Sequence, residues 1–214
     1  MIPKFFTTPI KHLVIEDFLT EEVNQKILNE MIEQKVNYRL AETGKGVIDE
    51  RTNYNLSYDH IFKDHRDESV LLNTMQELYR NVDFNILLSS MGYPFDHFST
   101  QTINETQVSR YGGEKGEHYN WHIDRYAPNH ERIITIVYYC FNEPKKFTGG
   151  QLELASNIMW KEQPIGKLDS KIYEIKNNMA VIFPSINMHR VHTTKSSDNF
   201  EDGRFSMNNW IGFK

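Results

Sequence analysis

The stretch that decides the fold is residues 132–141, which read Arg-Ile-Ile-Thr-Ile-Val-Tyr-Tyr-Cys-Phe. β-Branched and aromatic side chains dominate it, and residues of this kind favour extended backbone over helix. The segment that follows, from Asn142 to Gly150, contains the Pro and Gly residues that mark a turn. We therefore predict a strand that ends near Phe141.

Further segments of the same character follow residue 100 and are separated by turn clusters. They are Gln101–Tyr111, Gln151–Leu154, Lys171–Ile175, Ala180–Phe183, His189–Thr194 and Arg204–Phe213. Six to eight short strands predict a mainly β fold, a cupin-like jelly roll or double-stranded β-helix. The open mouth of such a barrel is a common place for a small-molecule site.

The first hundred residues are mostly helical in pattern. A short strand is expected at His12–Phe18, and Thr20 can then cap a helix. A second helix should begin at Asp67 or Ser69 and a third should cover Phe84–Met91. One apolar stripe on the first helix is formed by Val23, Ile27, Leu28, Met31 and Ile32, and one on the second by Leu71, Leu72, Met75, Leu78 and Tyr79. Residues 36–66 are expected to form a loop.

The 214 residues suffice for one well-buried core. We therefore expect a single domain over residues 1–214, with a helical support region at 1–100 and a jelly-roll catalytic core at 101–214. A formal net charge of −5 makes broad nucleic-acid binding unexpected, because such binding needs an excess of cations.

Cys140 is the only cysteine, so no internal disulfide can form and a reducing compartment is expected. Its apolar surroundings in the sequence predict that it packs in the core. The chain lacks an apolar run of membrane-spanning length and begins without a secretory signal pattern. We expect a soluble cytoplasmic protein without a membrane partner.

A metal site is suggested by His122 and Asp124, because residues two apart on a strand point to the same face. A third ligand can come from His189 or His192. Two histidines and one carboxylate on one face of an ion leave positions open, which is the arrangement of non-haem iron(II) oxygenases. A single His-x-Asp is weak evidence on its own. A second copy, at residues 65–67, lies in a polar run where a helix start is expected.

An arginine follows on the last predicted strand. Arg204 and Ser206 are two apart and therefore share one face. A guanidinium inside a barrel requires an anionic partner, and a carboxylate matches its planar pair of donors. The alternative is a salt bridge at the rim of the barrel.

These elements, in this order, resemble the Fe(II)- and 2-oxoglutarate-dependent dioxygenases of the prolyl 4-hydroxylase type, including the oxygen-sensing prolyl hydroxylases. The resemblance covers residues 108–213. It is carried by Tyr111 with Gly112-Gly113, by Tyr119 before His122 and Asp124, by the aromatic strand Ile136–Asn142 with Gly149-Gly150-Gln151-Leu152, and by Ala180–Ser185 leading to His189, with Arg204–Trp210 behind.

The resemblance implies catalytic roles for His122, Asp124, His189 and Arg204. The first three would hold Fe(II), with His189 rather than His192 as the distal ligand. Arg204, Tyr111 and Tyr139 match residues that bind 2-oxoglutarate. The resemblance further implies O₂ as oxidant, ascorbate as an accessory cofactor, and hydroxylation of a prolyl residue in a protein or peptide with release of succinate and CO₂.

Other functions stay open on the sequence. One is a non-catalytic jelly-roll module that binds a metal or a sugar. Arg204 disfavours this function, because metal retention alone has no use for a further cation. Another is a hydroxylase of a free amino acid or other small molecule. The loop near residues 49–53 lies where the family often carries substrate contacts, and no residue there is assigned a role.

Overall fold

The chain folds around two antiparallel sheets in the computed structural model, which describes residues 2–41, 51–92, 103–125, 132–161 and 163–212. The larger sheet has the order β1 (Ile2–Phe6), β2 (His12–Glu16), β11 (Met179–Pro184), β7 (Arg132–Cys140), β13 (Arg204–Gly212), β5 (Ile103–Tyr111), β4 (Tyr54–Ser57) and β3 (Arg39–Leu40). The smaller sheet has the order β10 (Gln163–Tyr173), β9 (Leu152–Trp160), β12 (His189–Lys195) and β6 (Glu117–His122), and β8 (Thr148–Gly149) pairs with β12. The predicted mainly β class is confirmed.

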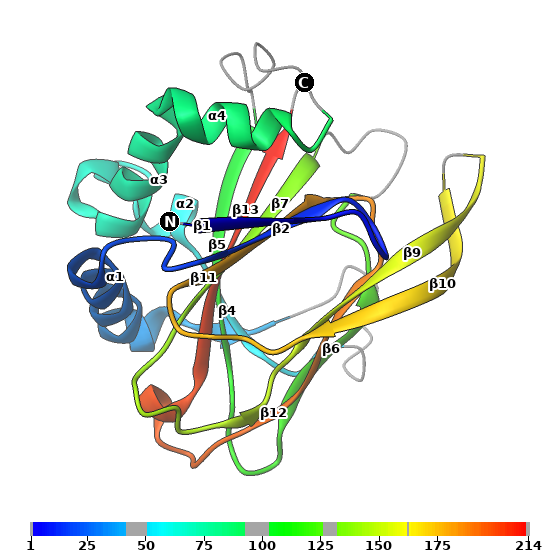
Figure 1. The fold of residues 1–214 in the computed structure, drawn as a ribbon. Coiled ribbons are helices and arrows are strands. Elements are labelled where there is room, and N and C mark those ends of the chain that lie inside the picture. The colour runs from blue at the N-terminus through cyan, green and yellow to red at the C-terminus, as the bar shows by residue number, and fades with distance from the viewer. Residues whose placement is uncertain (1, 42–50, 93–102, 126–131, 162, 213–214) are drawn as a thin grey trace.

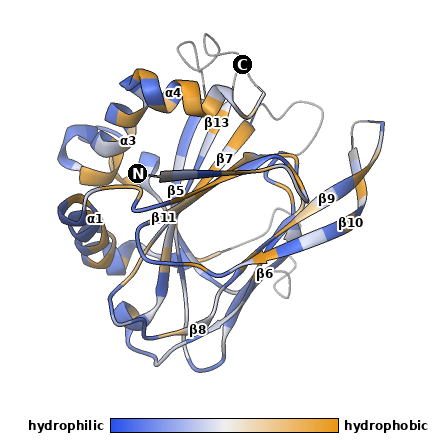
Figure 2. Cartoon of the chain, viewed as in Figure 1, coloured by the Kyte–Doolittle hydropathy of each residue, from blue (hydrophilic) through white to orange (hydrophobic). Residues whose placement is uncertain are grey.

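Helices cover the larger sheet on the side away from the smaller one, while the β9–β10 hairpin projects from the opposite side of the molecule (Figure 1). The helices are α1 (Glu21–Glu33), α2 (Tyr58–Ile61), α3 (Val70–Arg80) and α4 (Val82–Ser89), with 3₁₀ turns at Gln34–Asn37, Arg66–Glu68 and Phe200–Asp202. In Figure 2, α4 is largely hydrophobic and α1 largely hydrophilic. Accordingly, α1 buries only one stripe, which includes Ile27, Leu28 and Met31.

Side-chain caps fix where the helices begin. The Thr20 hydroxyl accepts a hydrogen bond from the backbone N–H of Val23, as predicted. Of the two residues proposed for the start of α3, Ser69 is the cap, because its hydroxyl accepts from the N–H of Leu72 at 3.1 Å.

Both faces of β7 are buried, which explains the unbroken apolar run that defined it. Ile136 and Tyr138 pack toward the helices, in the same cluster as Cys140. Val137 and Tyr139 point the other way, into a second apolar cluster between the sheets. Cys140 is fully buried, which confirms the expected packing role.

Two sequence predictions about where strands lie are wrong in part. The region 36–66 contains β4, which pairs with β5, so the first hundred residues add strands to the large sheet as well as helices. The predicted strands 151–154 and 171–175 belong to a longer hairpin, β9 and β10. Its outer part mixes exposed apolar and polar residues, so neither alternation nor an apolar run marks it.

Residues 101, 102 and 213, at the ends of two predicted strands, lie outside the described residues, as do positions 49 and 50 of the loop named above. Among the helices that the structure describes, none is long and apolar enough to cross a membrane.

Candidate active site

A cavity of about 150 Å³ lies between the two sheets. Alternation along the strands decides which side chains reach it. From β13 these are Arg204, Ser206, Asn208 and Trp210, and from β7 they include Val137 and Tyr139. The predicted site residues His122, Asp124, His189, Tyr111, Tyr139 and Arg204 all line this one cavity.

His122, Asp124 and His189 form a group that could hold a metal ion, with one ligand atom from each lying within 4.8 Å of the others. The Nε2 atom of His122 is 3.8 Å from Oδ1 of Asp124, and that of His189 is 3.5 Å from Oδ2. Ligands at about 2.1 Å from a common ion lie about 3 Å apart when they occupy adjacent octahedral positions. Small side-chain adjustments would therefore bring all three atoms onto one ion.

The backbone orients both imidazoles for metal binding. Nδ1 of His122 lies 2.8 Å from the carbonyl oxygen of Asn120, and Nδ1 of His189 lies 2.9 Å from that of Asn187. Because a carbonyl can only accept, each Nδ1 carries the proton and donates it. Each Nε2 then keeps a free lone pair that faces Asp124, which is the form in which histidine binds a metal.

Burial and charge keep His122 and Asp124 in the protonation states that bind a metal. Burial, reinforced by the nearby His189, holds the pKa of His122 well below its ordinary value, so this imidazole is neutral. For Asp124, burial alone would raise the pKa, but His189 and His122 outweigh it and the pKa falls. A hydrogen bond from the Thr135 hydroxyl at 2.8 Å also favours the ionised carboxylate.

Asp124 reaches this position in a different way from the one predicted. Strand β6 ends at His122, so the two residues do not share a strand face. Instead the chain bends, and the N–H of Asp124 donates to the carbonyl of Ser185 in the segment after β11. The ligands converge because the end of β6 is tied to the neighbouring chain segment that leads to His189.

Arg204 is one of the most deeply buried side chains, with 1% of its surface exposed. Its guanidinium carbon lies 4.8 Å from the ring centre of Tyr111 and 4.7 Å from that of Tyr139. Its Nη1 donates to the Ser206 hydroxyl at 3.2 Å. No carboxylate of the described residues lies within 4 Å of it, so a rim salt bridge does not explain this arginine.

Two hydrogen-bond donors on the cavity wall lack a partner within the described part of the chain. They are Nε of Arg204 and the Tyr139 hydroxyl, whereas the indole N–H of Trp210 is directed at the Asp124 carboxylate. Burial raises the pKa of Tyr139 to about 12, so its hydroxyl keeps the proton. Because buried donors of native proteins are normally satisfied, this wall fits a ligand rich in acceptors, such as a dicarboxylate.

His192, the alternative third ligand, lies outside the cavity lining and bonds to Glu153 at 2.7 Å. Trp121 is likewise absent from the lining and lies between Lys167 and Arg190. Arg51 and Arg132 line the cavity but were not assigned from the sequence. Arg132 opens a predicted strand, whereas Arg51 lies in the region expected to be a loop.

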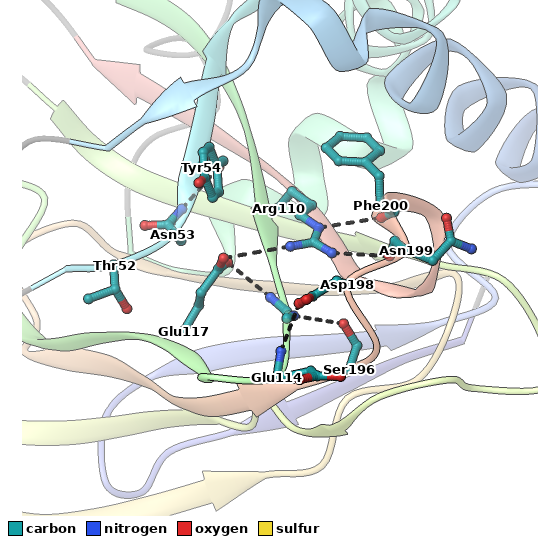
Figure 3. A network of polar contacts seen from close by, with 12 residues as sticks. Thr52, Asn53, Tyr54, Arg110, Glu114, Glu117, Ser196, Asp198, Asn199 and Phe200 are labelled. Carbon is teal, nitrogen blue, oxygen red and sulfur yellow. Dashed lines mark hydrogen bonds and ion pairs between the residues drawn. The ribbon is translucent and has the colours of Figure 1, made fainter.

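A second polar cluster lies on the opposite face of β5. Arg110 alternates with Tyr111 and turns away from the cavity, toward Glu117 at 3.6 Å and the backbone carbonyls of Asn199 and Phe200 (Figure 3). Burial raises the pKa of Glu117 to about 7 despite this cation. The cluster ties the β5–β6 turn to the segment before β13, and so holds together the strands that carry Tyr111, His122 and Arg204.

Residues 106–212 match the family described as the 2OG-Fe(II) oxygenase superfamily. The chain belongs to this family. This oxygenase is also 28% identical over 199 residues to an uncharacterised PKHD-type hydroxylase of Synechocystis sp.. That alignment covers 92% of the chain and 61% of the relative, so the chain spans less than two thirds of the relative's length.

Solved structures share the fold of the oxygenase. A prolyl 4-hydroxylase of Pseudomonas putida has a TM-score of 0.63 and 17% identity, covering 95% of this chain and 92% of its own. A prolyl hydroxylase of Trichoplax adhaerens, in complex with a hypoxia inducible factor peptide fragment, has a TM-score of 0.62 and 18% identity, with coverages of 94% and 83%. The α-ketoglutarate-dependent carbocyclase SnoK of nogalamycin biosynthesis has a TM-score of 0.62 and 10% identity, with coverages of 94% and 79%.

Family membership makes the oxygenase a 2-oxoglutarate-dependent non-haem iron dioxygenase, and it implies Fe(II), 2-oxoglutarate and O₂. It also confirms the resemblance predicted from the sequence, together with the jelly-roll core. The donor set fits these groups: a two-histidine, one-carboxylate cluster for ferrous iron, and unpaired buried donors around Arg204 for a dicarboxylate.

Proposed function

We propose that this oxygenase hydroxylates an unactivated C–H bond of a prolyl residue in a protein or peptide, and that one domain over residues 1–214 carries the activity. The observation that carries the proposal is the single cavity in which the metal-binding group and the unpaired Arg204 lie together. A protein that only retained a metal or bound a sugar would have no use for that buried cation.

In this proposal, bound iron and 2-oxoglutarate supply the oxidising chemistry: one atom of O₂ enters the substrate C–H bond, the other enters succinate, and CO₂ leaves. The substrate and 2-oxoglutarate each lose two electrons, and together these reduce O₂ completely.

The side chains of the cavity bind and orient. His122, Asp124 and His189 would hold the ion on one face and leave the other positions open. Arg204 would pair with the far carboxylate of 2-oxoglutarate, while the Tyr139 hydroxyl donates to it and Tyr111 packs against the guanidinium. The lining also includes the apolar residues Val137, Leu152 and Val191, which would exclude water from the reacting atoms.

Two finer points complete the proposal. Ascorbate would act as the reductant that keeps iron ferrous. The protein would work in the cytoplasm, where its lone buried thiol stays reduced.

Succinate formation from 2-oxoglutarate by the iron-loaded protein tests the proposal. We expect it to be lost in His122→Ala and Asp124→Ala, and retained in the matched variants His60→Ala and Asp83→Ala, whose side chains are exposed on α2 and α4. Screening of peptides and metabolites for a gain of about 16 mass units, the inserted oxygen atom, would identify the substrate. Turnover that survives in both cavity variants would refute the assignment.

A further inference from the structure

The active-site cavity is rich in arginine. Arg51, Arg132 and Arg204 line it, and Asp124 is the one acidic side chain among the described lining residues. This excess of positive charge is local, because the whole chain carries a formal net charge of −5. A cavity lined by one sign of charge attracts ligands of the opposite sign.

The three arginines differ in their partners. Arg132 is neutralised by an ion pair with Glu105 and stacks on Trp210. Arg204 has a role in the proposed function, as the partner of 2-oxoglutarate. Arg51 has no ion-pair partner, since no carboxylate of the described residues lies within 4 Å of it, and the proposed function gives it no role in binding 2-oxoglutarate.

Neutral amides hold the Arg51 guanidinium in place. Its Nε donates to Oδ1 of Asn53 at 2.6 Å, and its Nη2 donates to Oδ1 of Asn55 at 2.8 Å and approaches Oε1 of Gln107 at 3.4 Å. Amide oxygens orient the guanidinium but leave its charge unbalanced. An oriented, half-buried and uncompensated guanidinium is suited to bind a carboxylate.

Arg51 also lies close to the metal-binding group. Its guanidinium carbon is 4.4 Å from the ring centre of Tyr119, and the Tyr119 ring stacks on the His122 imidazole with centres 3.5 Å apart. The isolated bridge between Arg51 and Tyr119 fixes the backbone that carries it. The Tyr119 ring therefore contacts both the Arg51 guanidinium and the His122 imidazole.

A charge count indicates what the cation is for. A ferrous ion, the Asp124 carboxylate, the two carboxylates of 2-oxoglutarate and Arg204 together come to zero net charge. Glu105 cancels Arg132. One positive charge, that of Arg51, remains for the substrate.

We propose that Arg51 binds a carboxylate of the substrate, so that the molecule hydroxylated in this cavity is an acid. This inference rests on the proposed function and narrows its substrate class. The carboxylate can belong to a proline at a free C-terminus or to an acidic side chain next to the reacting proline. The chemistry at Arg51 is the same for both sources.

Two matched pairs of probes test the proposal and distinguish these sources. N-Acetyl-L-proline and N-acetyl-L-prolinamide differ only at the α-carboxylate, and acetyl-Asp-Pro-amide and acetyl-Asn-Pro-amide differ only at the side chain. Their affinities are measured by ligand-observed NMR on the protein loaded with Zn(II) and 2-oxoglutarate, which binds but does not turn over. The variants are Arg51→Gln and Arg51→Lys, with Arg80→Gln, an exposed arginine at the end of α3, as control.

We expect the acid of at least one pair to bind wild type and Arg80→Gln at least about tenfold more tightly than its amide, as one charge-assisted contact requires. The preference should fall to about twofold or less in Arg51→Gln and persist in part in Arg51→Lys. The loss should be larger for the acid probe than for 2-oxoglutarate. The pair that shows the preference identifies the source of the carboxylate.

Equal affinity for acid and amide in the wild type, or a preference that survives in Arg51→Gln, would overturn the proposal. So would failure of all four probes to bind the wild type, or an equal loss of 2-oxoglutarate affinity in Arg51→Gln, which would make Arg51 a co-substrate residue. Succinate formation by the iron-loaded wild type is measured in parallel. If it occurs without any acid preference, this inference fails and the proposed function stands.

Discussion

Replacing Arg204 by methionine should leave the ligand-free protein at least as stable as the wild type while removing its response to 2-oxoglutarate. Methionine matches the aliphatic stem of arginine but is shorter and carries no charge. In the structure Arg204 is fully buried, donates a hydrogen bond to Ser206 and has no carboxylate partner among the described residues. A buried arginine with a purely structural role would be paired with a carboxylate of the protein.

The magnitude follows from these contacts. Burial of an ion costs several kcal/mol. Against this stand the two aromatic contacts, of about 1–2 kcal/mol each, and one hydrogen bond of about 1.5–3 kcal/mol. These contributions nearly cancel. We therefore expect the free energy of unfolding of Arg204→Met without ligand to equal that of the wild type or exceed it by up to about 2 kcal/mol, which raises Tm by up to about 4–8 °C.

Binding of 2-oxoglutarate should change in the opposite sense. Loss of a paired, charge-assisted contact of about 3 kcal/mol raises the dissociation constant more than about a hundredfold. At a ligand concentration about 100 times the wild-type dissociation constant, the wild type gains about 2.7 kcal/mol of stability. Arg204→Met gains less than about 0.5 kcal/mol under the same conditions.

Thermal and denaturant unfolding of the Zn(II)-loaded proteins, with and without 2-oxoglutarate, measures both effects. Arg110→Met is the matched control, because Arg110 is also buried but faces a carboxylate, Glu117. At about pH 8 the replacement of Arg110 leaves the Glu117 carboxylate without its cation, which should destabilise the protein with and without ligand. If Arg204→Met behaves like Arg110→Met and keeps the ligand response, the assignment of Arg204 to a co-substrate carboxylate is refuted.

Three further predictions follow from the contacts around the cavity. Thr135→Val removes the hydroxyl that donates to Asp124 and should weaken metal binding about 10–100-fold in a competitive chelation titration; an unchanged affinity would mean that this contact does not orient the ligand. Tyr139→Phe removes one unpaired donor from the cavity wall and should raise the 2-oxoglutarate dissociation constant about fivefold to tenfold, whereas an equal or lower constant would contradict the role given to this hydroxyl. Glu117 has a folded-state pKa of about 7 against an ordinary 4.5, so between these values the unfolded chain releases a proton that the fold retains, and stability falls as pH rises. Glu117→Gln should flatten that decline by about 1–2 kcal/mol after solvent screening, and equal slopes in denaturant titrations of the two proteins would disprove it.

The parts of the fold that the sequence predicts are those in which local pattern and tertiary burial agree. β7 and β11 are buried on both faces, so each appears as an almost unbroken apolar run, rich in β-branched and aromatic residues. Thr20 caps α1 through contacts within four residues, which a local pattern can also predict. Because most of the predicted cavity residues lie on or next to these two strands, their positions along the chain could also be predicted.

Elements defined by distant partners escaped prediction. Tyr54–Ser57 buries only Leu56 and includes polar residues, and it becomes a strand because it pairs with β5, about fifty residues away in sequence. The outer part of the β9–β10 hairpin exposes Trp160 and Ile165, so its side chains carry no signal of a core face. In both cases backbone pairing, rather than side-chain pattern, determines the strand.

The two arginines without a carboxylate partner mark the limit of sequence analysis at the site. Arg204 was predicted because it opens the last strand of the expected barrel, and a guanidinium inside a barrel requires an anionic partner. Arg51 gave no such signal, since its neighbours Asn53 and Asn55 are polar and its charge suits a solvated loop. The family resemblance placed substrate contacts near residues 49–53 but assigned no role to Arg51. Its meaning depends on three tertiary facts: the stack on Tyr119, the amide acceptors, and the absence of an acid among the described residues around it. The unbalanced charge of Arg51 exists only once the cavity has assembled. The preference for an acidic substrate therefore depends on a residue whose role the local sequence pattern does not indicate.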